Sequence, residues 1–184
     1  EQARQGINQK YANITLNEWF EEWFTKYKIP QIKETSINPM RSRYYGTFGA
    51  IIGNKKVVDI LNIDIQEVMN TMHEQGRASS SMRDALGRVR ECLESAKNNR
   101  IITVNPCFDI VVPWEKKSKP RRFLTKEEQN KFLETAGKGW YKEMFYTMFL
   151  TGMRVGEIGG LKWEDIDFKN KCIHIKRSLS CQYY

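Results

Sequence analysis

Residues 151–167 read TGMRVGEIGGLKWEDID, and this stretch sets a cation, Arg154, between a glycine and a glutamate in a largely apolar run. The part from Arg154 to Trp163 predicts a short helix despite its glycines. An arginine flanked by apolar residues usually reaches past them to water, so the local sequence alone is weak support for catalysis. Glycines are costly in a helix, by up to about 1 kcal/mol each relative to alanine. Close approach of neighbouring backbone or of a binding partner would explain them, and a sharp turn would explain Gly152 equally well.

Two helices are predicted on the N-terminal side of this stretch. The segment LTKEEQNKFLETA (124–136) opens on a capping box formed by Thr125 and Glu128. The segment WYKEMFYTMFLTG (140–152) predicts a strongly apolar helix with two adjacent ridges. The ridges are Trp140, Met144 and Met148 beside Tyr141, Phe145 and Phe149.

A β-hairpin is predicted on the C-terminal side. Residues 164–179, EDIDFKNKCIHIKRSL, alternate in polarity, and KNK supplies the turn. The alternation places apolar and polar side chains on opposite faces of the second strand. Ile173 and Ile175 share one face, and Cys172, His174 and Lys176 share the other.

The N-terminal part of the chain predicts a four-helix unit. Helical patterns run over residues 16–27, 36–48, 64–76 and 79–99. The first follows a capping box of Thr15 and Glu18, the second tolerates Pro39 only in its first turn, and Gly76 stops the third. The fourth presents a buried stripe of Leu86, Val89, Leu93 and Ala96. We expect the tryptophans at 19, 23, 140 and 163 in the core.

The chain is basic, with a net charge of +8 and a pI near 9.3. Such an excess attracts polyanions, nucleic acid first and acidic membrane surfaces second. Residues 1–112 hold 15 basic and 13 acidic residues, whereas residues 113–184 hold 15 basic and 9 acidic residues, so most of the positive excess lies in the second part. The segment KKSKPRR (116–122), with five cations and a proline, reads as a basic linker between two domains.

Several classes of protein are disfavoured. No run approaches the roughly 20 apolar residues that cross a bilayer, and the opening EQARQGINQK lacks the apolar region of a signal peptide. We therefore expect a soluble intracellular protein. The cysteines at 92, 107, 172 and 181 form no C-x-x-C pair, and we expect His73 and His174 to lie far from any ligand cluster with them. The prediction is four reduced thiols and no metal.

Residues 116–175 resemble the opening of the catalytic domain of tyrosine recombinases, the phage-integrase family. The most specific part is T-G-x-R-x-x-E followed by L-x-W-x-D-I-D. Residues 79–106 similarly resemble that family's core-binding domain, whose last helix ends in the same NP. The resemblance implies a mainly α fold, with an N-terminal four-helix core-binding (SAM-like) DNA-binding domain over 1–113. A basic linker over 114–122 would join it to the first part of an α+β catalytic domain over 123–184.

The resemblance also implies an activity. It is the site-specific cutting and rejoining of double-stranded DNA through a 3′-phosphotyrosine link, for integration and excision of a mobile element, without metal or other cofactor. The implied assembly is a homo-oligomer, a tetramer on paired sites or a dimer on one site. No membrane partner is expected, and the location is the bacterial cytoplasm, at the nucleoid.

Two residues carry over to the family's catalytic motif. Arg154 takes the place of the first catalytic arginine, and Glu157 that of the acidic residue that supports the active site. A guanidinium suits this place, because negative charge develops on the phosphate oxygens during strand cleavage. The family's other catalytic residues have no match, and Tyr183 and Tyr184 lie too early to be the nucleophile. We therefore expect a fragment that cannot cleave DNA alone.

DNA contacts are expected from two groups of residues. On the helices they are Ser36, Arg41, Arg43, Ser81, Arg83 and Arg88, and in the linker Lys116, Lys117, Lys119, Arg121 and Arg122. Solvated helix faces and helix caps would explain the first group equally well. Two other functions remain open: a non-enzymatic DNA-binding regulator, and an enzyme like type IB topoisomerases that relaxes DNA without sequence choice.

Overall fold

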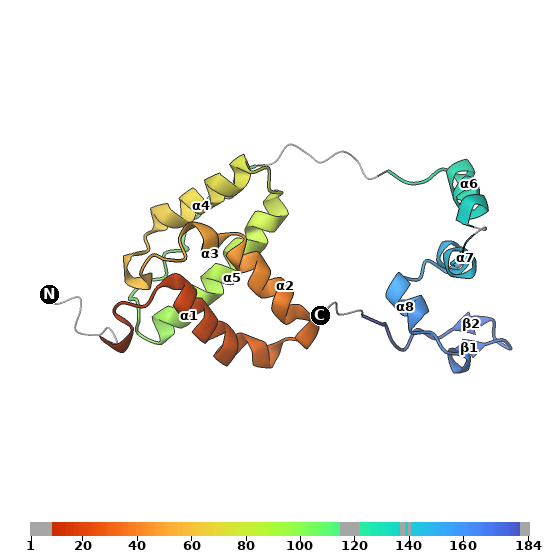
Figure 1. Cartoon of the computed structure of the whole chain (residues 1–184), viewed down its shortest axis with the longest axis horizontal. Coiled ribbons are helices and arrows are strands. Elements are labelled where there is room, and N and C mark those ends of the chain that lie inside the picture. The colour runs from red at the N-terminus through yellow and green to blue at the C-terminus, as the bar shows by residue number, and fades with distance from the viewer. Residues whose placement is uncertain (1–8, 115–121, 137–138, 140, 181–184) are drawn as a thin grey trace. The chain divides into compact units, whose positions relative to one another are not determined.

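The chain folds into two compact units, Glu1–Ser118 and Lys119–Tyr184 (Figure 1). The computed structural model describes residues 9–114, 122–136, 139 and 141–180. Within this part of the chain, no helix is both long enough and apolar enough to cross a membrane.

The first unit is helical. Its α-helices are α1 (Leu16–Trp23), α2 (Glu34–Tyr45), α3 (Phe48–Ile51), α4 (Asn62–Glu74) and α5 (Ser79–Asn98). A π-helical turn at Phe24–Lys28 extends α1, and a 3-10 turn at Val57–Asp59 precedes α4. The long helix α5, green in Figure 1, packs against α1, α2 and α4, so it is the centre of the unit.

The core of this unit forms where the apolar faces of α1 and α5 meet. The predicted capping box starts α1: the Glu18 N–H donates to Thr15 Oγ1, and the Thr15 N–H donates to the Glu18 carboxylate. The indole Nε1 of Trp19 then donates to the Cys92 carbonyl of α5 at 3.0 Å. The predicted α5 stripe is buried throughout: Leu86, Val89, Leu93 and Ala96. The four-helix prediction is confirmed, with the short α3 in addition.

The second helix differs from its prediction at both ends. It runs over Glu34–Tyr45, so Pro39 is its sixth residue and lies inside the helix instead of in the first turn. The ring removes one intrahelical hydrogen bond, and this is tolerated because the preceding turn is exposed to water. The chain then leaves the helix at Gly46, and a separate turn, α3, begins at Phe48.

Neither Ser36 nor Ser81 caps its helix. Each is the third helical residue, because α2 begins at Glu34 and α5 at Ser79. The N-cap positions are held by Lys33 and Ala78, neither of which makes a side-chain cap bond. The serine-cap interpretation of these two residues is therefore wrong.

The second unit contains α6 (Lys126–Ala136), α7 (Lys142–Thr151), α8 (Val155–Gly159), β1 (Ile166–Asp167) and β2 (Cys172–Ile173). The Thr125–Glu128 capping box at the start of α6 is confirmed. Strands β1 and β2 form the predicted antiparallel hairpin, with Ile166 opposite Ile173 and Asp167 opposite Cys172. The whole chain is thus mainly α, with strands only in the second unit among the described residues.

The second unit buries little of its apolar surface. Among its described residues, Met153 and Asp165 are the side chains that are buried. Trp163 is 82% exposed, which contradicts the core prediction, whereas Trp19 and Trp23 are buried as predicted and Trp140 lies outside the described residues. Trp163 and Asp165 share a three-residue 3-10 turn, and the inner side of that turn is taken by Asp165.

Candidate nucleic-acid interface and catalytic arginine

Arg154 stands at the junction of α7 and α8. Helix α7 ends at Thr151, and its C-cap residue Gly152 adopts a left-handed conformation with φ of 71°, so the chain turns sharply there. Met153 turns inward and is buried, and Arg154 becomes the N-cap residue of α8. Of the explanations offered for Gly152, the sharp turn is confirmed, because a residue with a side chain rarely adopts this φ.

Glu157 fixes Arg154 at two points. The Arg154 backbone N–H donates to Glu157 Oε2 at 2.9 Å, and Nη1 donates to Oε1 at 2.8 Å. The hydrogen bond from the Arg154 backbone N–H lowers the pKa of Glu157 most, and the hydrogen bond from the guanidinium lowers it further. The carboxylate therefore remains ionised at neutral pH. The side chain of Arg154 is nevertheless 86% exposed. A guanidinium anchored on one side and open on the other can receive an anion such as a phosphate.

The chain after the hairpin packs closely on α8. The Leu179 N–H donates to the Gly156 carbonyl at 2.8 Å. A Cβ at Gly156 would lie 2.5 Å from Ser178 Oγ and 2.6 Å from the Leu179 carbonyl oxygen. Close approach of backbone therefore explains this glycine.

Two cations of the hairpin are engaged by Asp165, which is 1% exposed. Lys176 Nζ lies 3.3 Å from its Oδ1, and the Arg177 guanidinium also pairs with it. Burial acts to raise the pKa of Asp165, but hydrogen bonds from the Lys162 N–H, Arg177 and Lys176 outweigh it and lower the pKa. Arg177 is thus committed to a structural pair.

The expectation that both histidines lie far from a ligand cluster with the cysteines is wrong for His174. Its Nε2 lies 3.6 Å from Cys172 Sγ, whereas His73 is exposed on α4. The spacing Cys-x-His in the predicted strand was the signal, because residues i and i+2 of extended chain share a face. Asp167 stands beside them.

An open cavity of about 700 Å³ lies between α2 and α5 and is called here the α2–α5 groove. Three of the predicted DNA-binding residues line it, namely Arg43, Ser81 and Arg88. Sequence reasoning missed Ser42, Arg77 and Ser80, which also line it. Hydroxyls and guanidinium groups are the donors that proteins use on phosphates.

One carboxylate stands among the described residues that line this groove, that of Asp84. Arg88 Nη2 lies 2.5 Å from its Oδ2, and Arg43 Nη1 lies 3.8 Å away. Asp84 therefore draws arginines from two helices toward a single point. Arg43, Arg77 and Arg88 still outnumber it, so the groove is positive.

The other predicted contacts lie elsewhere. Arg41 joins α2 to α1 through Glu21, with Nε 3.0 Å from Oε1, and its guanidinium lies 5.3 Å from the Phe24 ring centroid. Ser36 and Arg83 are exposed outside the lining of the groove. Arg122 pairs with Glu128. Lys116, Lys117, Lys119 and Arg121 lie outside the described residues.

Comparisons with known proteins agree with this architecture. A model of the phage integrase N-terminal SAM-like domain matches residues 15–73, and a model of the phage integrase family matches residues 122–181. A XerC-like tyrosine recombinase of Caldanaerobacter subterraneus is 28% identical, over 96% of this chain and 46% of its own length. The ICEBs1 integrase of Bacillus subtilis is 29% identical, over 69% of this chain and 37% of its own length. The chain thus spans less than half of these relatives.

Solved structures share the fold. A lambda integrase tetramer bound to a Holliday junction superposes with a TM-score of 0.74 at 21% identity, covering 90% of this chain and 48% of that one. The Tn1549 transposon integrase in complex with circular intermediate DNA superposes with a TM-score of 0.70 at 17% identity. The match covers 90% of this chain and 55% of that one. Since both units match models of one family, and a tyrosine recombinase aligns with 96% of the chain, the chain belongs to the phage integrase family, the tyrosine recombinases.

Proposed function

We propose that this chain is part of a site-specific recombinase that cuts and rejoins duplex DNA through a 3′-phosphotyrosine intermediate, in the integration and excision of a mobile element. The observation that carries the proposal is Arg154, anchored by Glu157 and open to solvent. The names of the relatives support the class of reaction, since they include recombinases, integrases and transposon transposases.

Arg154 and Glu157 have distinct roles in this proposal. When a tyrosine hydroxyl attacks a phosphodiester, negative charge grows on the non-bridging oxygens, and a fixed guanidinium stabilises it most in the transition state. Glu157 acts through Arg154 and is a positioning residue, because it holds the N–H and the guanidinium of Arg154 at once. Metal and other cofactors have no part in this proposed chemistry.

The first unit supplies the DNA-binding surface in this proposal. Arg43, Ser81 and Arg88 would contact phosphates from the α2–α5 groove, with Ser42, Arg77 and Ser80 beside them. The linker cations and Arg122 would add charge along the duplex. Four copies would assemble on paired sites, or two copies on one site, in the bacterial cytoplasm, at the nucleoid. The lambda integrase relative was solved as such a tetramer on a Holliday junction.

The full-length protein is expected to form a covalent adduct with a nicked duplex that carries the end sequence of its own mobile element. The nick lets the cleaved strand leave, so the phosphotyrosine intermediate accumulates. The adduct is measured as a band that survives denaturing electrophoresis. No adduct under any condition would favour the non-enzymatic regulator. Adducts of equal yield on unrelated duplexes would favour the topoisomerase-like alternative.

Asp84→Asn is expected to tighten binding to duplex DNA about twofold to fivefold, because it frees Arg43 and Arg88 from an internal partner without changing side-chain size. Binding is measured by fluorescence anisotropy over a range of salt concentrations. The affinity of both proteins should fall steeply with salt. The slope should be steeper for the variant by up to about one unit per freed arginine that meets a phosphate.

Asp59→Asn is the matched control, since it removes the same charge from an exposed residue that does not line the groove. It should change affinity little. Equal gains for both variants would show that only net charge matters and would remove the groove from the proposed interface.

A further inference from the structure

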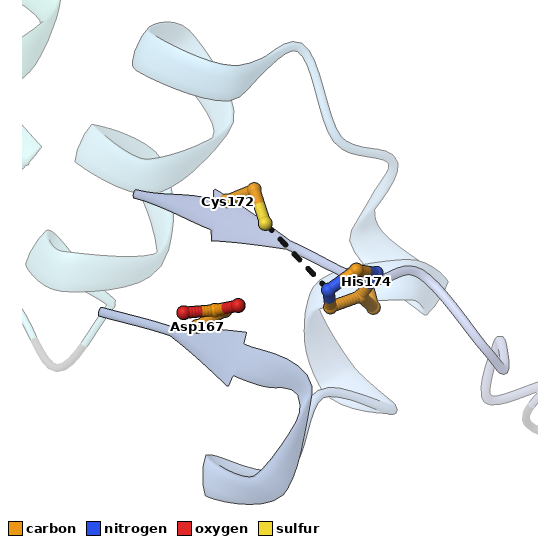
Figure 2. Close-up of side chains that lie close together, drawn as sticks. All are labelled: Asp167, Cys172 and His174. Carbon is orange, nitrogen blue, oxygen red and sulfur yellow. Dashed lines mark hydrogen bonds between the residues drawn. The ribbon is translucent and has the colours of Figure 1, made fainter. Parts of the chain in front are cut away.

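The hairpin of the second unit brings three metal-ligating side chains to one face. Asp167 on β1 lies directly opposite Cys172 on β2, and His174 follows two residues later, so all three side chains share that face. Ile166 and Ile173 occupy the other face. Figure 2 shows the cluster, with Cys172 and His174 joined by a dashed line and Asp167 beside them.

The distances suit a tetrahedral metal ion. Cys172 Sγ lies 3.6 Å from His174 Nε2, and the three ligand atoms lie within 4.8 Å of one another. Zinc bonds of about 2.3 Å to sulfur and 2.0–2.1 Å to nitrogen, at a tetrahedral angle, separate those two atoms by about 3.6 Å. The thiol and imidazole are thus already at ligand spacing, and a small movement of the carboxylate completes a three-ligand set.

The carboxylate of Asp167 is oriented by the turn that it closes. The Asn170 N–H donates to Oδ1 at 2.9 Å, and Asn170 Nδ2 donates to Oδ2 at 2.7 Å. These two hydrogen bonds hold the carboxylate in one orientation. Each carboxylate oxygen retains a lone pair for a metal, and Asn170 would serve as an outer partner of the kind that fixes ligands in metal sites.

Cys172 differs from the other described cysteines. Cys92 and Cys107 are buried, and burial raises the pKa of both thiols, that of Cys107 to about 12. Buried neutral thiols are poor metal ligands, because the thiolate is the binding form. Cys172 is only half-buried, and its partner His174 is exposed.

From this geometry we propose that Asp167, Cys172 and His174 bind a divalent transition metal ion, with zinc the best fit. One thiolate, one imidazole and one carboxylate match the preference of zinc, whereas magnesium and calcium favour oxygen ligands alone. The exposed side of the cluster leaves a fourth position for water.

The ion would act as a clip between the two strands. Each strand has two residues, and an isolated two-stranded hairpin is marginally stable in water. A metal bound to Asp167 and Cys172 would join β1 to β2. It would also hold the start of the segment whose Leu179 packs on Gly156 of α8. The inference stands apart from the proposed recombination chemistry, since no reaction step passes through the ion.

The test is a titration of the full chain, purified without a histidine tag, with Co²⁺ and then Zn²⁺. Co²⁺ bound to a thiolate in a tetrahedral site gives a sulfur-to-metal charge-transfer band and intense visible absorption, which Zn²⁺ should remove. Cys172→Ser and His174→Gln should each weaken Zn²⁺ binding at least tenfold in competition with a chromophoric chelator. Asp167→Asn should weaken it also, and it keeps an acceptor for the Asn170 N–H.

His73→Gln is the matched control and should leave Zn²⁺ binding unchanged. Far-UV circular dichroism of each variant without metal separates loss of a ligand from loss of fold. Hydrogen exchange of the hairpin amides should slow when Zn²⁺ is present. Zn²⁺ affinity that is the same in the folded variants at 172 and 174 as in the parent protein would overturn the proposal, as would the absence of a thiolate–Co²⁺ band.

Discussion

In the complete protein, Arg154→Ala is expected to lower the single-turnover rate of DNA strand cleavage by about a hundredfold or more, with little change in folding or DNA affinity. One guanidinium among many phosphate-binding cations adds little to ground-state binding. At the scissile phosphate, however, it meets charge that grows toward the transition state. Loss of such a contact costs about 3 kcal/mol or more. The measurement is single-turnover cleavage beside a thermal melt and a binding isotherm.

Arg154→Lys should remain badly impaired, because lysine keeps the charge but loses the planar donor fork that Glu157 orients. Lys131→Ala is the control, since it removes a positive charge from an exposed site on α6 in the same unit. Normal cleavage by Arg154→Ala would leave Arg154 only a structural role, in its pair with Glu157. The same conclusion would follow if its activity fell only because the protein unfolded.

Trp19→Ala is expected to reduce the free energy of unfolding of the first unit by about 3–5 kcal/mol. The indole is 2% exposed in the core between α1 and α5, and its loss leaves a large cavity. It also removes the indole N–H, which donates a hydrogen bond to the Cys92 carbonyl at 3.0 Å. The measurement is urea denaturation of the full chain followed by far-UV circular dichroism.

Trp114→Ala provides the comparison, since Trp114 lies in the same unit but is 74% exposed. Its replacement should change the free energy of unfolding by less than about 0.5 kcal/mol. Trp19→Phe should fall between the two, because it keeps a six-membered aromatic ring in the core but loses the five-membered ring of the indole with its Nε1 donor. Similar effects of the two alanine variants would contradict the assigned core.

The sequence predicts those parts of the fold that rest on local rules. The capping boxes at Thr15 and Thr125, and the apolar stripe of α5, each depend on residues within a few positions of one another, and all are present in the structure. The core prediction for Trp163 is wrong because the exposure of this side chain depends on which side of a short turn faces inward. That side is decided by the pairing of Asp165 with Lys176 and Arg177, eleven and twelve residues away.

The residues of the candidate sites also divide into those that local sequence predicts and those that depend on distant contacts. Arg154 could be proposed only through a family motif, since nothing local separates it from a boundary arginine. Arg77 and Ser80 could not be assigned to the groove beforehand, because their positions depend on how α2 and α5 meet. The approach of Cys172 to His174, in contrast, follows from strand alternation and was open to prediction.

The contact between Trp19 and Cys92 joins positions 73 residues apart. At a synthesis rate of 5–20 residues per second, roughly 4 to 15 s pass on the ribosome between the appearance of the first partner and that of the second. During that interval the aromatic face of α1 has no α5 to cover it. The nascent chain therefore presents the apolar face of α1 for seconds before the first unit can close, and we expect chaperones to bind α1 during that interval.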